Sequence, residues 1–262
     1  MESKILEVTP ETAAGWLKNN PRNRNLNAKV VDDLARAILQ GNWALNGEAI
    51  KLSSDGQLLD GQHRLSAIVK SGATVEMLVV TGLEPWTQDT MDTGRKRTTA
   101  DVFAIHGEGN TNVLAAVTKR VWMWEQGNHK FANFSSPSTL ELMETLDRFP
   151  TLRRSAEIGA RVNHEYRAAC ASVTGTAHHI LHRVDESDAA EFFARLGTGA
   201  ELPLEHPLLT LRRRLQRDRD TGKRYVFHAT LGMYIRTWNA IREGRTLGQL
   251  IQPPEANMPM PV

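Results

Sequence analysis

Cysteine is almost absent from this sequence, since Cys170 is the only one in 262 residues. A single cysteine excludes an internal disulfide and any zinc site built from several cysteines. Long apolar runs are also missing, because none approaches the roughly 20 residues that span a bilayer. The first residues, Met-Glu-Ser-Lys, lack the charged and apolar regions of a signal peptide. These absences predict a cytoplasmic protein with no membrane partner.

An excess of charge of one sign is missing as well. The chain has 32 Lys and Arg against 30 Asp and Glu, so its net charge is +2. Its pI of about 8.8 is below the value typical of a dedicated nucleic-acid-binding domain. Overall charge therefore predicts no partner, and a nucleic acid would have to bind to a local group of arginines. Apolar residues make up 40% of the chain, which is enough for a packed core in one large domain or two smaller ones.

The stretch Leu58–Ala67 carries the densest set of chemically versatile side chains. Its pattern predicts the end of a strand, a turn at Gly61 and the start of a helix that runs to Gly72. Just upstream, Asp55-Gly56 lies between two apolar runs, which is a strong hairpin signal. The stretch is therefore expected to connect a hairpin to a helix.

The residue types at this junction favour an anionic ligand. A glycine between strand and helix lets the backbone come close to a ligand. The helix start offers free N–H groups and a positive dipole end, which most often bind phosphate. Arg64 can add a forked donor, and Asp60 and His63 are candidate catalytic residues for proton transfer. The alternative is a tight turn followed by a solvated helix start.

The motif Gly-x-x-Arg-x-x-Ala after a hairpin, ending in Ser71-Gly72, resembles the ParB/sulfiredoxin-like superfamily. Asp-Gly-Gln-His-Arg resembles its DGQHR-type branch, with relatives in phages and actinobacteria. In ParB the equivalent box grips the triphosphate of CTP, and in a related serine kinase it grips ATP or ADP. In sulfiredoxin it carries a reactive cysteine, but Gln62 stands at that position here, which excludes sulfiredoxin chemistry. The resemblance covers about the first 105 residues.

The resemblance implies an α/β domain that binds a nucleoside triphosphate, CTP or ATP, and it leaves the participation of magnesium open. The expected nucleotide-binding residues are Arg22, Arg24, Gly61, Gln62, His63, Arg64, Arg95 and Arg97. Arg97 matches the arginine of the family's third box, Glu-Asn-x-x-Arg. Thr93-Gly94 does not match the Glu-Asn of that box.

Three classes of function follow from such a site. The favoured one is a nucleotide-binding, DNA-associated ParB-like protein of a phage or mobile element, with a homodimer left open. The second is a phosphotransferase or nucleoside triphosphatase with Asp60 or His63 as the base. It is disfavoured because Asn20–Arg24 contains no carboxylate, whereas the related kinase has one ahead of its first core helix. The third is a non-enzymatic phage or defence factor with a vestigial anion pocket.

The second half of the chain has a helical pattern from Asn110 to about Arg245. The predicted fold class is therefore α+β, with a ParB/sulfiredoxin-like domain containing a small mixed sheet over residues 1–108. An all-helical domain is expected over 109–252, and a disordered tail over 253–262.

The densest basic run lies in this helical half. Its candidate contacts to a nucleic-acid backbone are Arg212, Arg213, Arg214 and Arg217. The alternative is a solvated helix end, because Asp218 and Asp220 dilute the positive charge.

Three histidines also cluster in the helical half. His178 and His182 are one helical turn apart, at a spacing that can share a metal ion. Neither an HExxH motif nor a nearby pair of carboxylates accompanies them, so packed or surface histidines are favoured and no metal is predicted.

Overall fold

A computed structural model describes residues 1–20, 23, 25–91, 97–132, 136–223, 226–250 and 258–262. The described residues divide into two compact units. Unit 1 comprises residues 1–96 together with 135–140, and unit 2 comprises 97–134 together with 141–262. Unit 1 contains the sheet and unit 2 is helical, so the mixed α+β character predicted from the sequence is confirmed.

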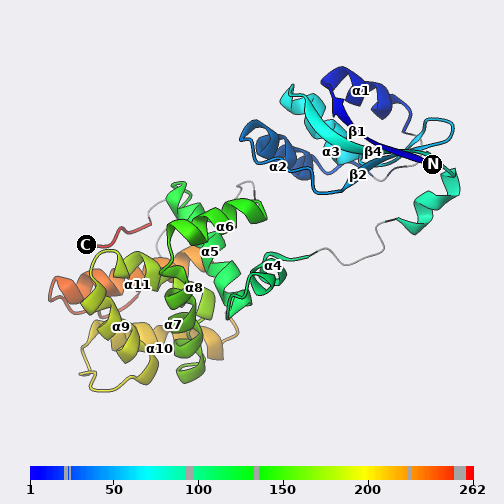
Figure 1. The fold of residues 1–262 in the computed structure, drawn as a ribbon. Coiled ribbons are helices and arrows are strands. Elements are labelled where there is room, and N and C mark those ends of the chain that lie inside the picture. Colours follow the sequence, from blue (N-terminus) through cyan, green and yellow to red (C-terminus); the bar gives the residue numbers. More distant parts are fainter. Residues whose placement is uncertain (21–22, 24, 92–96, 133–135, 224–225, 251–257) are drawn as a thin grey trace. The chain divides into compact units, whose positions relative to one another are not determined.

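The described residues of unit 1 form a small mixed sheet with helices between its strands (Figure 1). The strands are β1 (Glu2–Val8), β2 (Ala49–Ser53), β3 (Leu58–Asp60) and β4 (Val75–Leu83). The helices are α1 (Pro10–Lys18), α2 (Ala28–Leu39), α3 (Gln62–Ser71) and the 3-10 helix η1 (Pro85–Thr90). The strand order is β1-β4-β2-β3, with β2 parallel to β4 and the other two pairs antiparallel.

The predicted hairpin at Asp55-Gly56 is confirmed between β2 and β3. Gly56 has a positive φ of 79°, which glycine adopts without strain. The turn is closed because the Gly56 amide donates to the Ser53 carbonyl at 3.1 Å, and the Ser53 amide donates to the Gln57 carbonyl at 2.9 Å. The hairpin delivers β3 beside β2, and the chain passes from β3 directly into α3.

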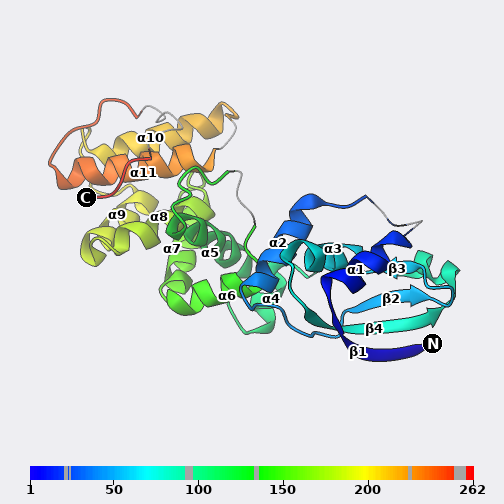
Figure 2. The same ribbon diagram turned by 90° about the horizontal axis from the view of Figure 1, so that it is seen from above.

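Helices α1, α2 and α3 lie on one face of this sheet (Figure 2). Their apolar side chains pack with those of the strands, and Ile50, Leu65 and Ile68 have no exposed surface. Side chains cap two of the helix starts: the Thr9 side chain accepts from the Thr12 amide of α1, and the Asn27 side chain accepts from two amides of α2. This packing fixes the starts of α2 and α3 relative to the sheet.

The remaining helices belong almost entirely to unit 2. They are α4 (Thr99–Ile105), α5 (Thr111–Glu125), α6 (Thr139–Arg148), α7 (Leu152–Glu165), α8 (Ala171–His182), α9 (Glu186–Thr198), α10 (Pro207–Asp220) and α11 (Phe227–Arg242). None of the helices in the described part of the chain is long and apolar enough to cross a membrane.

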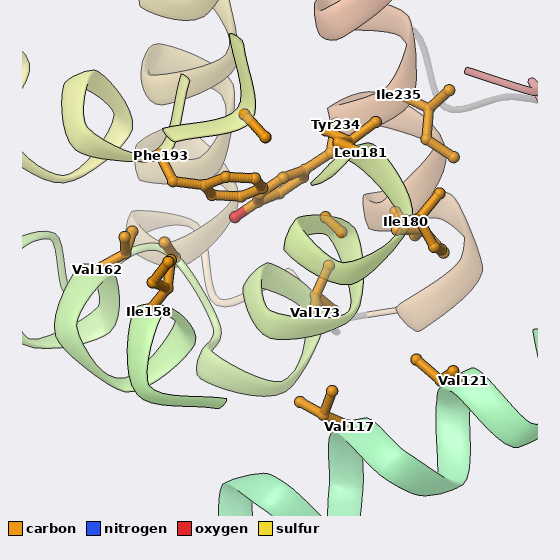
Figure 3. Packing of buried hydrophobic residues seen from close by; sticks show 14 of the residues in the cluster. Val117, Val121, Ile158, Val162, Val173, Ile180, Leu181, Phe193, Tyr234 and Ile235 are labelled. Atoms are coloured by element: carbon orange, nitrogen blue, oxygen red, sulfur yellow. The ribbon is translucent and has the colours of Figure 1, made fainter. Parts of the chain in front are cut away.

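The centre of unit 2 is α8, which is surrounded by α5, α7, α9 and α11 (Figure 3). Every residue of α8 from Val173 to Leu181 is buried. One polar contact ties it to a later helix: the hydroxyls of Thr174 and of Tyr234, from α11, lie 2.9 Å apart. The apolar period of the sequence predicted a helix here, and its burial on all sides explains why Figure 3 shows side chains converging on it from both earlier and later helices.

Two glycines allow α7 to pack closely on α8. A Cβ at Gly159 of α7 would lie 2.4 Å from the Ala171 carbonyl oxygen. A Cβ at Gly175 of α8 would lie 2.9 Å from the Ser155 carbonyl oxygen. Both distances are shorter than a van der Waals contact, so the two helix backbones approach as closely as glycine permits.

The last five residues, Met258–Val262, lie against α11, although the sequence suggested a disordered tail over 253–262. The Asn239 side chain donates to the Met260 carbonyl at 2.8 Å and accepts from the Val262 amide at 3.2 Å. The Trp238 indole donates to a Val262 oxygen at 2.9 Å. These three bonds give the segment an ordered path without regular secondary structure.

Candidate anion-binding site at the start of α3

Gly61 makes the turn from β3 into α3. Its φ is +105° and its ψ is 9°, a left-handed conformation that side chains with a Cβ rarely adopt. A Cβ at this position would also lie 2.4 Å from Ile50 Cδ1 and 3.4 Å from Ile50 Cα. The backbone conformation therefore favours glycine, and a side chain at this position would displace the end of Ile50. The turn brings the backbone of the helix start directly against β2.

His63 connects the starts of two helices. Its Nε2 atom accepts the backbone N–H of Asn27 at 3.0 Å, so a neutral His63 carries its proton on Nδ1. Asn27 is the residue that caps α2, and its side chain accepts from the Lys29 and Val30 amides at 3.1 and 3.4 Å. The positive ends of the α2 and α3 dipoles consequently lie one side chain apart. Such a convergence favours an anion more strongly than one helix start does.

Gln62, the first residue of α3, is only 5% exposed and belongs to a chain of carboxamide groups. Its Oε1 accepts from Asn20 Nδ2 at 3.2 Å, and Asn20 Oδ1 accepts in turn from Asn23. Gln88 of η1 donates to Asn23 Oδ1 at 3.2 Å and to the Leu59 carbonyl at 2.9 Å. This network holds the segment after α1 and the η1 helix against the β3–α3 junction.

The sequence interpretation did not identify Asn20, Asn23 or Gln88 as part of this region. One signal was present, because Asn19, Asn20, Asn23, Asn25 and Asn27 make the segment before α2 unusually rich in asparagine. Carboxamides can both donate and accept, which suits a network at a crowded backbone junction.

Arg64 makes its contacts with residues of unit 1. Its guanidinium donates to the Ala49 carbonyl at 2.9 Å, to Asp60 Oδ2 at 3.2 Å and to Glu48 Oε2 at 3.2 Å. Its side chain is 15% exposed. Asp60 Oδ2 also lies 3.2 Å from Lys51 Nζ. Arg64 thus ties α3 to β2, and the same Asp60 oxygen is shared by two cations.

The structure does not place the remaining expected nucleotide-binding residues at this junction. Arg22, Arg24 and Arg95 lie outside the residues that the structure describes. Arg97 is exposed and lies at the start of unit 2, so the structure does not relate it to Gly61.

Two of the three histidines of α8, His178 and His179, are core residues. His178 is 3% exposed and His179 is 1% exposed, and His178 Nδ1 lies 2.9 Å from Ser155 Oγ. Across the described ranges, no group of three or more His, Cys, Asp or Glu side chains is placed to hold a metal ion. The rings of His178 and His182 stack with centroids 5.3 Å apart, as in packed aromatic pairs.

The four arginines of α10 that the sequence proposed as nucleic-acid contacts fall into two groups. Arg212 donates to the Gly197 carbonyl at 3.0 Å and stacks 3.9 Å from the centre of the Tyr166 ring. Arg214 donates to Asp218 at 2.9 and 3.0 Å and to the Leu250 carbonyl at 2.6 Å. Arg213 and Arg217 are exposed. Two of the four arginines therefore hold unit 2 together.

The geometry at this junction is that of two helix starts joined by one hydrogen bond beside a glycine turn. Comparison with known proteins identifies neither a family model, nor a curated protein, nor a solved structure that matches the chain. The function is consequently argued from the residues themselves.

Proposed function

We propose that unit 1 binds the polyphosphate of a nucleoside triphosphate, CTP or ATP, at the start of α3, in the manner of a ParB/sulfiredoxin-like domain. The observation that carries the proposal is the hydrogen bond from the Asn27 amide to His63, which brings the first turns of α2 and α3 together. The Gly61 turn adds a backbone without a side chain at the same place. Phosphate is the usual ligand of such helix starts.

Charge in the neighbouring segments supports this ligand. Lys29 is exposed in the first turn of α2, where an ammonium group adds to the positive end of the dipole. The resemblance assigns Arg22 and Arg24 to the same role from the preceding segment. Arg64 has a supporting role in this proposal, since its bonds to Ala49 and Asp60 hold the first turn of α3 to the sheet.

The same contacts favour binding over phosphoryl transfer. A general base needs a lone pair directed at the nucleophile. His63 Nε2 already accepts the Asn27 amide, and Asp60 Oδ2 faces both Lys51 and Arg64. Both candidate bases therefore have structural partners, which supports a site that holds a nucleotide without consuming it.

The test is isothermal titration of the full chain with CTP and with ATP, each with and without magnesium. We expect saturable binding of one of the two nucleotides by the wild type. His63→Ala removes the acceptor that aligns the two helix starts, and Lys29→Gln removes a nearby charge. Each should weaken binding about tenfold, which corresponds to about 1.4 kcal/mol.

Lys70→Gln provides the matched control, because Lys70 is an exposed lysine in the last turn of α3, where it pairs with Asp32. It should bind like the wild type. Absence of binding by the wild type, or equal weakening in Lys29→Gln and Lys70→Gln, would contradict the proposal. Melting temperatures without nucleotide identify any variant that is merely unfolded.

A further inference from the structure

An exposed face of α10 borders a hollow of about 460 Å³ that is open to solvent. The hollow runs along α10 beside the end of α7. Its lining includes Tyr166, Arg212, Arg213, Gln216, Arg217 and Asp220. Those from the helix recur at intervals of three and four residues, so they share one face. The hollow is therefore elongated along the helix axis.

Two exposed cations, Arg213 and Arg217, lie on this face. Neither has an ion-pair partner among the described residues. They are one turn apart, which places their Cβ atoms about 5–6 Å from each other. This contrasts with Arg214, which lies on the same helix but is neutralised by Asp218 at 2.9 Å. Charges of both signs are interspersed on a surface designed for solubility, whereas Arg213 and Arg217 lie together without an ion-pair partner in the described part of the chain.

The Arg212 side chain is held in place at the edge of the hollow. Its guanidinium is held by the Gly197 carbonyl and by the face of Tyr166, and Tyr166 Oη donates to the Arg212 carbonyl at 2.5 Å. Gly199 leaves room for this arginine, because a Cβ there would lie 2.9 Å from Arg212 Cζ. The charge of Arg212 is therefore fixed at the edge of the hollow before any ligand arrives, which reduces the ordering cost of binding.

One carboxylate limits where an anion can lie. Asp220 lines the C-terminal end of the hollow and accepts from Gln216 Nε2 at 2.8 Å. An anionic ligand is repelled from that end and attracted to the part lined by Arg213 and Arg217. The favourable segment is thus a strip about one helical turn long, flanked by Arg212.

We propose that this face of α10 binds the phosphodiester backbone of duplex DNA. Each DNA strand presents a phosphate about every 3.4 Å along the axis, so two long arginine side chains about 6 Å apart can each reach a different phosphate of one strand. An open, elongated surface fits a polymer better than it fits a small nucleotide, which is normally enclosed. No base-reading contact is assigned, so binding is independent of sequence. The proposal does not depend on the nucleotide site of unit 1.

The experiment is fluorescence anisotropy of the full chain with a labelled DNA duplex at several sodium chloride concentrations. Each phosphate contact contributes about −0.9 to the slope of log K against log salt. Arg213→Gln/Arg217→Gln should make the slope less steep by about 1.8 and weaken binding at low salt. The matched control is Arg154→Gln/Arg161→Gln on α7, which removes two exposed arginines and the same net charge.

The control double variant should retain the wild-type slope. Three results would overturn the proposal. The first is that the wild type does not bind the duplex at about 50 mM salt. The second is that both double variants lose the same amount of DNA affinity. The third is that inorganic tripolyphosphate displaces the duplex completely at equal phosphate concentration. The last result would identify a site for a small anion. Melting temperatures should be unchanged in both double variants, since all four side chains are exposed.

Discussion

At the scale of single residues, Gly61 combines a left-handed backbone conformation with a close approach to Ile50. We expect Gly61→Ala to lower the free energy of unfolding by about 2–4 kcal/mol, since it adds both backbone strain and a clash. The strain comes from φ of +105°, and the clash from a Cβ 2.4 Å from Ile50 Cδ1. Urea-induced unfolding measures the change.

Gly72→Ala separates the two causes of destabilisation, backbone strain and steric clash. Gly72 also has a positive φ of 68°, but a Cβ there would meet nothing within 4 Å. Its replacement should cost about 1 kcal/mol, from backbone strain alone. Ile50→Val removes Cδ1, so the cost of Gly61→Ala should be smaller in that background. Equal costs for Gly61→Ala and Gly72→Ala would contradict the close approach to Ile50.

The sequence identified the residues of this junction better than it identified their contacts. A glycine between a hairpin and a helix predicts a turn with helix amides behind it, and Gly61 makes that turn. The orientation of Arg64 was not predictable from the motif. It depends on Asp60, the last residue of β3, and on the Ala49 carbonyl in β2. The contact with Ala49 exists only after the sheet has formed.

At the scale of elements, the α7–α8 contact depends on the absence of side chains. Gly175→Ala places a Cβ 2.7 Å from Val117 Cγ2 and 2.9 Å from the Ser155 carbonyl oxygen. Overpacking of this kind costs about 1–3 kcal/mol, which outweighs the gain of about 1 kcal/mol in helix propensity. Thermal unfolding should show a lower melting temperature.

Gly15→Ala is a control for which the expected change in stability has the opposite sign. Gly15 lies within α1, is exposed, and a Cβ there would meet nothing within 4 Å. Alanine has a higher helix propensity than glycine and meets no clash here, so the variant should be more stable by about 0.5–1 kcal/mol. A stabilising effect of Gly175→Ala would show that α7 and α8 are not in close contact.

Elements with local signals were predicted from the sequence. The helical pattern of the second half of the chain covers α8, and Asp55-Gly56 marks the hairpin between β2 and β3. The strand β1 was not predicted. Its residues are mostly exposed, and it becomes a strand by pairing with β4 more than sixty residues later. A partner so distant leaves no pattern within the strand itself.

At the scale of the whole molecule, two buried histidines make stability depend on pH. Burial lowers the pKa of His178 from its ordinary 6.5 to about 3, with further lowering by His182. Burial lowers the pKa of His179 to about 4, and Arg183 adds to the effect. Both are neutral in the folded protein. The unfolded chain binds protons below pH 6.5 that the folded protein does not, so stability falls as the pH decreases from about 6.5 toward 4.

Between about pH 6.5 and 4, each of the two histidines is expected to lower the free energy of unfolding by about 1.4 kcal/mol per pH unit. Urea-induced unfolding at pH 7, 6 and 5 measures it. His179→Leu should remove about half of this dependence, whereas His106→Gln should not change it, because His106 is exposed. A stability that does not change between pH 7 and 5 would contradict neutral burial of the pair.

The position of α8 also affects how the chain is made. Its neighbours α5 and α7 precede it in the sequence, whereas α9 and α11 follow it. On the ribosome, α8 is synthesised before half of its apolar cover exists. Until α11 has emerged, the nascent chain exposes an apolar helix, which is the kind of segment that chaperones bind and that aggregates when translation stops early. Truncation before residue 227 should therefore yield insoluble protein, even though the sheet of unit 1 is complete.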